Sequence, residues 1–429
     1  MKKTILVMII LFLSVFSIFA VNFEIGLQGF YDFEDFNDRV GVKIYHLAPN
    51  FDFVADIGFY SDEKYSFYES DYYLDHYFLI ENGYITFRSF NNSIKFSSGI
   101  KDLQDEVNSP YSLFFSSERI SQPYLEFGYE DEHMFYDTRW IQLVSSSNNY
   151  FDEPKSMNYK TYGLKFGDFR FGYQDAVVYN REFDFFYLFN PLPVYFSQEI
   201  RASENIMPWA EKSKNDNSLM GFFIDYDKPT YYFYSQILVD DLNTNRFFYP
   251  EKTQNPDKIA FSSGITFKTS AGNFGLHGAL ATQYTFEPGG GPSYTVYPDN
   301  KLINYKENYI GYKYGENAAS VLVDYLYTYK NRFDIYSSFE TVFSGSKSPT
   351  KNIAPLVEGT HFLDEDTLEK SFIYTISANL YFKFFELNAS AHVGKIFNEL
   401  TYDDTNYCFV PSNTDKDLLN VDLGFKVKF

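Results

Sequence analysis

The chain has 429 residues, and its 57 acidic side chains outnumber 36 basic ones, which gives a formal charge of −21. Such an excess of acid excludes a nucleic-acid partner, because phosphate binding needs a basic surface. Aromatic residues make up 21% of the chain, yet its mean hydropathy is −0.31. No apolar run of 18 residues follows the N-terminal one, which excludes a helical membrane protein. An outer-membrane β-barrel is the class of protein that combines a high aromatic content with a polar mean hydropathy.

Residues 1–20 predict a signal peptide that is cleaved after Ala20. Lys2 and Lys3 precede an apolar run that ends in a small residue, the layout of a secretory leader. The run is short for a helical span, which needs about 20 residues. Residues 21–429 are then expected to form one barrel domain.

The first mature stretch alternates apolar and polar residues with a period of two. In "VNFEIGLQGFYDF", Ile25 and Leu27 share one face, and Glu24 and Gln28 share the other. This pattern predicts a strand between two different solvents. Similar strands are predicted at 51–59, 77–90, 93–101, 159–166, 169–179, 217–227, 230–240, 259–268, 273–286, 320–329, 333–343, 372–383 and 386–396, with weaker patterns at 40–47, 121–129 and 134–145.

Short and long connections alternate between these strands. The short ones hold turn residues, such as Pro49-Asn50 and Gly167-Asp168, whereas the long ones are polar. Bacterial barrels have short periplasmic turns and long outer loops, so both termini are expected in the periplasm. The count is 18 strands if 287–319 is one loop, or 20 if 293–299 and 308–314 are strands; the loop residues of "EPGGGP" favour 18.

The last stretch, "LLNVDLGFKVKF" at 418–429, is predicted to close the barrel. Its apolar residues stand at odd positions, as they do in the first strand. Pairing the two strands leaves no sheet edge in the lipid. Phe425 then faces lipid, and the terminal Phe429 sits at the periplasmic interface, where aromatic residues are common.

Residues that could carry catalysis are few. Cys408 is the single cysteine, the six histidines have no metal-ligand spacing, and no nucleophile, phosphate-binding or dinucleotide motif is present. We therefore expect no enzyme, no metal and no cofactor. Asp240 and Asp241 form a conspicuous acidic pair, either a solvated strand end or a contact for a cation or sugar.

The connection 180–216 is too apolar for a solvated outer loop. We interpret it as a loop that folds into the barrel and narrows the lumen. Its rings either pack only against the wall or also stack on sugar faces. In the second case Tyr187, Tyr195 and Trp209, together with Asp240 and Asp241, are the candidate glycan contacts.

Five segments follow one another in an order that resembles the Wzi family of outer-membrane capsule-assembly proteins. They are "FFSSERISQPYLEF" (114–127), "GLKFGDFRFGYQDAVVYN" (163–180), "YLFNPLPVYFSQE" (187–199), "DNSLMGFFIDYDKPTYYFYSQILVDD" (216–241) and "NYIGYKYGENAASVLVDYLY" (308–327). The resemblance implies an 18-stranded barrel with an occluded lumen that organises surface polysaccharide without enzymatic activity. It also implies that the barrel-assembly machinery of the outer membrane reads the C-terminal strand ending in Phe429.

Two functions are compatible with these patterns. The first is a non-catalytic barrel that binds surface polysaccharide, with outer-membrane lipid as its other partner. The second is a cation-selective porin, because barrels of this size can leave an aqueous channel and the chain is acidic. An occluded lumen would separate the two.

Overall fold

The computed structural model describes residues 22–31, 36–62, 76–89, 91–115, 121–146, 151, 153–202, 216–242, 245–249, 251, 255–288, 291–299, 304–352 and 359–429. The signal-peptide prediction falls outside these ranges, as does Trp209. No helix in the described ranges is long and apolar enough to cross a bilayer.

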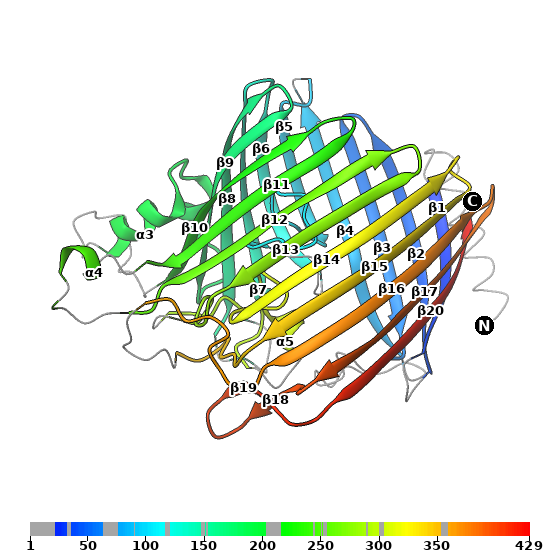
Figure 1. Ribbon diagram of the computed structural model, residues 1–429. Coiled ribbons are helices and arrows are strands. Elements are labelled where there is room, and N and C mark those ends of the chain that lie inside the picture. The colour runs from blue at the N-terminus through cyan, green and yellow to red at the C-terminus, as the bar shows by residue number, and fades with distance from the viewer. Residues whose placement is uncertain are drawn as a thin grey trace.

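Eighteen antiparallel strands form one closed sheet (Figure 1). They are β1 (Asn22–Tyr31), β2 (Phe36–Ala48), β3 (Phe51–Tyr60), β4 (Tyr77–Ser89), β5 (Ile94–Lys101), β6 (Gln122–Glu130), β7 (Met134–Val144), β8 (Lys155–Phe166), β9 (Phe169–Tyr179), β10 (Asn217–Asp227), β11 (Tyr231–Asp241), β12 (Lys258–Thr269), β13 (Gly272–Ala281), β14 (Ala318–Tyr329), β15 (Phe333–Ser344), β16 (Glu369–Tyr381), β17 (Phe385–Phe397) and β20 (Lys416–Lys428). The long connections add a hairpin, β18 (Leu400–Asp403) and β19 (Cys408–Pro411), and the short helices α2 (Phe185–Phe189), α3 (Val194–Ala202), α4 (Asn245–Phe248) and α5 (Tyr305–Asn308).

The prediction of an 18-stranded barrel is confirmed. The segment 282–317 joins β13 to β14 as one long connection, so the 20-strand alternative is wrong. The three weaker patterns are all strands. The strand predicted at 159–166 begins earlier, at Lys155: Ser156 and Asn158 face a covered part of the outer wall, and Lys155 contacts the loop 282–317 inside the barrel.

The first and last strands close the barrel as predicted. Leu27 pairs with Phe425, and both side chains lie on the outer surface. The backbone N–H of Phe429 donates to the carbonyl of Phe23 at 2.9 Å. The closure satisfies the backbone groups that an open edge would leave exposed.

The two faces of the wall differ in chemistry. Outward residues are apolar and exposed, as Val321 and Val323 of β14 show. Inward residues include polar ones, such as Ser320 of β14 and Gln236 of β11, and apolar ones where the wall borders the buried core, such as Leu322 of β14. An exposed apolar exterior of this kind is suited to the hydrocarbon of a bilayer.

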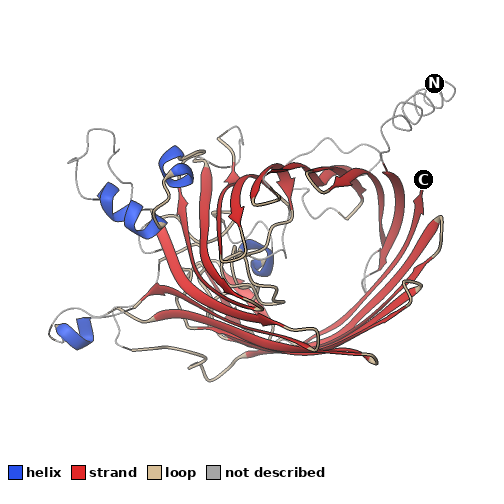
Figure 2. Ribbon diagram, turned by 90° about the horizontal axis from the view of Figure 1, so that it is seen from above, coloured by secondary structure: helices blue, strands red, loops and turns tan. Residues whose placement is uncertain are grey.

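Two connections fold into the barrel and form a plug against the wall from β6 to β15. The first is 102–115, which follows β5, and the second is 282–317, which contains α5. Figure 2 shows α5 enclosed by the ring of strands. The predicted narrowing of the lumen is thus confirmed, but by other loops than the sequence suggested.

The prediction that 180–216 enters the lumen is wrong for its described part. Helices α2 and α3 contact β7, β8, β9 and β10 on the outer face of the wall (Figures 1 and 2). Tyr187 and Val194 pack with Val177 and Tyr179, which point outward, whereas Ala176 and Val178 point to the plug. The wall therefore supplies a second surface on which an apolar loop is buried, besides the lumen.

Candidate functional site: the plugged lumen and the outer loops

The carboxylate of Asp105 organises the first plug segment. Its two oxygens accept from the backbone N–H groups of Val107, Leu113 and Phe114 at 3.1–3.2 Å. One oxygen also accepts from the side-chain amide of Gln236 on β11 at 2.9 Å. Burial raises the pKa of Asp105 to about 6, and these hydrogen bonds oppose the rise. One buried group thus folds the loop and ties it to the wall.

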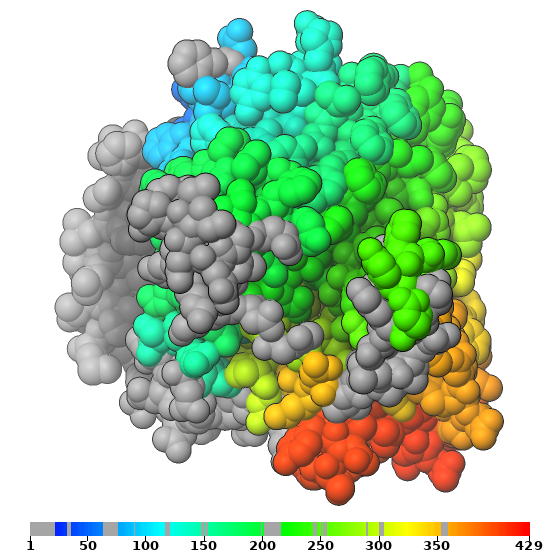
Figure 3. Space-filling view, turned by 90° about the vertical axis from the view of Figure 1, so that its left-hand side faces the viewer, coloured from blue at the N-terminus to red at the C-terminus, as the bar shows by residue number. Residues whose placement is uncertain are grey.

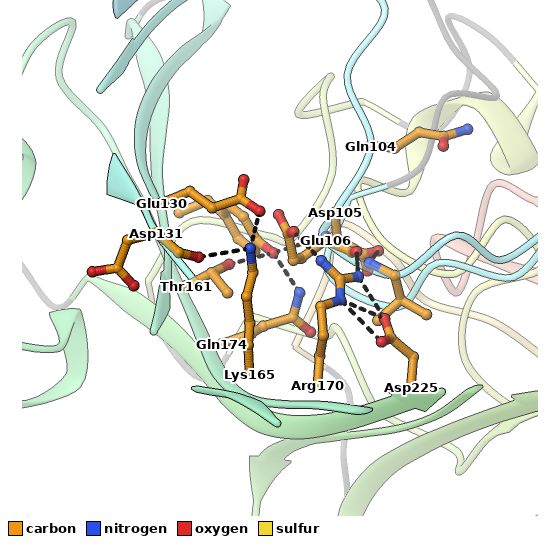
Figure 4. Close-up of polar contacts among 12 residues, drawn as sticks. Gln104, Asp105, Glu106, Glu130, Asp131, Thr161, Lys165, Arg170, Gln174 and Asp225 are labelled. Atoms are coloured by element: carbon orange, nitrogen blue, oxygen red, sulfur yellow. Dashed lines mark hydrogen bonds and ion pairs between the residues drawn. The ribbon is translucent and has the colours of Figure 1, made fainter. Parts of the chain in front are cut away.

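A second tie is ionic (Figure 4). The Arg170 guanidinium on β9 pairs with Glu106 of the plug at 2.9 Å and with the buried Asp225 of β10 at 2.5 Å. The backbone carbonyl of Gln104 accepts from Arg139 on β7 at 2.6 Å. Charge-assisted contacts of this geometry are stronger than neutral hydrogen bonds. The plug is therefore held at several points of the β7–β11 wall.

Between these ties lies a core of buried aromatic and aliphatic side chains. Leu113 and Phe114 are fully buried, and Phe114 lies 6.3 Å from the ring of Tyr159 on β8. The second plug segment contributes Tyr294, whose hydroxyl donates to the carbonyl of Phe114 at 2.7 Å. A continuous core of buried side chains thus joins both segments to the wall and fills this sector of the barrel.

The second plug segment is fixed by a buried polar cluster. The carboxylate of Glu316 accepts from the backbone N–H of Ser348 at 2.5 Å and from the hydroxyl of Tyr309 at 3.3 Å. Lys347 donates to the backbone carbonyl of Glu316 at 2.6 Å. Burial raises the pKa of Glu316 and lowers the pKa of Lys347, while the attraction between the two opposes both shifts. The cluster connects the plug to the loop after β15.

Polar cavities remain beside the plug. One of about 490 Å³ is lined by inward residues of β1 to β4 and β20. Three of its four acids pair with cations: Arg39 binds Glu81 at 2.5 Å, Lys43 lies 3.5 Å from Asp56, and Lys426 lies 3.8 Å from Glu24. The fourth, Asp62, accepts from the hydroxyl of Tyr77 at 2.6 Å. A cavity of about 430 Å³ lies between the plug and β14 to β17. Because most acids of the first cavity are paired with cations, its wall attracts mobile cations less strongly than the net charge of the whole chain suggests.

Exposed rings occur on two of the long connections, at α4 and at the β18–β19 turn. Phe247 and Phe248 of α4 are 71% and 73% exposed, and Tyr407, after β18, is 50% exposed. The ammonium of Lys351 lies 4.9 Å from the ring centre of Tyr407. Figure 3 shows α4 in light green and the β18–β19 hairpin in orange-red on this side of the molecule. Exposed aromatic faces beside polar groups are suited to stacking on sugars.

The structure separates the residues that the sequence proposed as glycan contacts. Tyr187 is fully buried against the outer wall, so it packs and is not available to a sugar. Tyr195 lies on α3, outside the barrel, and is 36% exposed. Asp240 accepts from the backbone N–H of Phe286 in the plug at 3.0 Å, and a β-bulge there places Asp241 opposite Lys258. The two carboxylates thus have different partners: Asp240 contacts the plug, and Asp241 lies opposite Lys258 on β12.

The plug residues were missed by reasoning from the sequence. The segment 102–120 has several polar residues, which suggested a solvated loop. The available signal was its apolar cluster at 111–115, "YSLFF", and the tyrosines of 294–314. Polar residues in both segments serve the buried ties described above.

No family model and no curated protein matches the chain. Among solved structures it is similar to Wzi of Escherichia coli, a carbohydrate-binding outer-membrane β-barrel involved in group 1 capsule assembly, with 12% identity over 97% of this chain and 86% of that chain and a TM-score of 0.60. OccAB4 of Acinetobacter baumannii (12% identity, 95% and 98% coverage) and OccD3 of Pseudomonas aeruginosa (10% identity, 96% and 91% coverage) both have a TM-score of 0.48. At these identities the likeness is one of fold, and that fold is the β-barrel of the outer membrane.

Proposed function

We propose that this protein is a non-enzymatic outer-membrane barrel that holds surface polysaccharide at its outer loops. The plug core carries the proposal, because a barrel filled by two packed and ionically tied loops is poorly suited to passive flow. β1 begins and β20 ends at the end of the barrel that carries the short turns; we assign that end to the periplasmic side, as in bacterial barrels. The outward apolar face then contacts outer-membrane lipid, and the barrel-assembly machinery inserts the chain.

The fold likeness to Wzi supports the same function, since that protein is a carbohydrate-binding barrel. In this chain the proposed contact surface is the outer-loop face, which consists of α4 and the β18–β19 turn. Phe247, Phe248 and Tyr407 offer ring faces there to the CH groups of sugars. Asp403 accepts from the backbone of Thr405 and Asn406 and so fixes the turn that carries Tyr407.

The outer-loop face is tested by replacing its three rings. In a Phe247→Ala, Phe248→Ala, Tyr407→Ala variant, retention of purified cell-surface polysaccharide should fall at least tenfold. The matched control is Phe382→Ala, which removes an exposed ring at the opposite, short-turn end. Equal retention by the variant and the wild type would contradict the assignment of this face.

A passive channel is the second candidate, and the polar cavities beside the plug favour it. They are lined by inward charged residues and lie outside the plug core. A channel formed by them would show a steady conductance in a planar bilayer. Polysaccharide binding without conductance supports the first function, and conductance without binding supports the second.

A further inference from the structure

The outer face of β8 and β9 carries charged side chains at a level of the barrel that is expected to lie within the lipid bilayer. Lys160 and Asp175 are paired across these strands, point outward, and are fully buried. Lys160 precedes Phe166, an exposed ring at the short-turn end, by six residues. At about 3.3 Å per residue and a tilt of about 40°, it lies roughly 15 Å above that ring, within an apolar band about 25 Å tall.

The segment between α2 and α3 satisfies this pair from outside. Lys160 donates to the backbone carbonyl of Leu192 at 2.8 Å and to that of Asn190. The backbone N–H of Val194 donates to Asp175 at 2.7 Å. These partners are backbone N–H and C=O groups, which need hydrogen bonds of their own where no water is present. The contacts therefore fit a segment built to sit on the wall, and not a loop that lies on it by chance.

Both ends of the stretch 182–198 are fixed at the wall. At its C-terminal end, the side-chain amide of Gln198 donates to the carbonyl of Asp216 at 2.8 Å. The indole N–H of Trp140 on β7 donates to the carbonyl of Glu182 at 2.7 Å. Arg181 pairs with Asp216, just before β10, at 2.8 Å, and the hydroxyl of Tyr187 donates to the same carboxylate at 2.8 Å. The ring of Tyr187 stacks on that of Tyr179 with centres 5.6 Å apart. The stretch 182–198 is thus tied to β7, to β9 and to the residue before β10.

The opposite side of the segment is apolar and exposed. Phe185 is 69% exposed, Phe189 56% and Phe196 57%. Toward the short turns this surface continues into the exposed outward residues Leu164 of β8 and Phe171 of β9. The polar groups of the segment face the wall and its aromatic rings face away from the wall. This arrangement is expected for a surface that contacts hydrocarbon.

We propose that residues 182–198 form a lipid-immersed cover whose partner is the acyl layer of the outer leaflet. Two observations choose lipid as the occupant: the continuity of the exposed rings with the apolar band, and the height of the covered Lys160–Asp175 pair. The cover replaces the strands as the lipid-facing surface over the outer half of the β7–β10 wall. This inference does not depend on polysaccharide binding.

Nitroxide labels test the cover in the full-length barrel. Cysteines replace Phe185, Phe189 and Phe196 one at a time, with Cys408→Ala as the background, and the labelled proteins are reconstituted in phosphatidylcholine vesicles. Accessibility to oxygen should exceed that to a water-soluble nickel complex at all three sites, as at the lipid-facing control Phe171→Cys. The control in water is Tyr407→Cys, where the order should be reversed.

Three other outcomes would overturn the proposal. Labels that behave like the one at position 407 would place the segment in water. Labels shielded from both reagents, with disulfide-linked dimers at position 196, would assign the face to a second copy of the chain. Where a labelled variant fails to fold, Phe189→Trp gives a second readout: lipids brominated on the acyl chain should quench its added fluorescence, and absence of quenching would contradict the cover.

Discussion

The substitution Phe114→Ala tests whether the plug core closes the barrel. Phe114 is fully buried where the first plug segment meets Tyr159 of the wall and Tyr294 of the second segment. Removal of a buried phenylalanine ring costs about 3–5 kcal/mol because a cavity remains. Since about 1.4 kcal/mol changes an equilibrium constant tenfold, the undocked population of the plug should rise by about two to three and a half orders of magnitude.

The assay is single-channel recording in a planar bilayer. The wild type should be closed almost all of the time, and Phe114→Ala should show frequent openings. Phe189→Ala is the matched control, because it removes an equal ring from the exposed side of α2. Wild-type behaviour of Phe114→Ala, with the folded state confirmed by its heat-modifiable migration, would refute the plug as the closing element.

Three further predictions concern the ties and the chain end. Burial raises the pKa of Asp105 to about 6, above its unfolded value of about 3.9. Its contribution to plug docking is therefore complete below about pH 4 and is lost as the pH rises through 6. Channel openings should increase over that pH window, and Asp105→Asn should flatten the increase. Arg170→Ala leaves the buried Asp225 without its cation and should lower the free energy of unfolding by about 3–5 kcal/mol. Urea unfolding in detergent measures this loss. Arg170→Lys should recover only part of the lost free energy, because lysine lacks the planar guanidinium group that pairs with a carboxylate through two hydrogen bonds. Phe429→Asp should reduce the amount of folded barrel in the outer-membrane fraction more than Phe384→Asp, an exposed ring at the same end; equal amounts would count against a special role of the last residue.

The barrel could be predicted from the sequence because its signal is local. Each strand shows period-two alternation by itself, and the odd positions of Leu27 and Phe425 define the closing register without any distant contact. The turn residues between strands set the parity of the count. The early start of β8 could not be predicted, because Ser156 and Asn158 are polar residues on the outward face of the strand. Polar residues at outward positions of a barrel strand are typical of a loop outside the membrane, and only the cover explains them here.

The position of the long loops could not be predicted, because the apolar content of a segment shows only that it is buried and not where. For 180–216 the apolar content fits burial in the lumen or on the outer wall equally well, and the outward Lys160 and Asp175 are the residues that indicate a covered outer wall. For 102–115 the polar Asp105 and Glu106 suggested solvent, although each has a partner on the wall.

The location of a bound glycan tests the central claim most directly. An oligosaccharide from the cell surface, added to the barrel in lipid nanodiscs and located by electron cryomicroscopy, should lie against α4 and the β18–β19 turn with the plug in place. Density for the sugar inside the cavities beside the plug, with the plug displaced, would contradict a surface-binding function and support transport through the barrel.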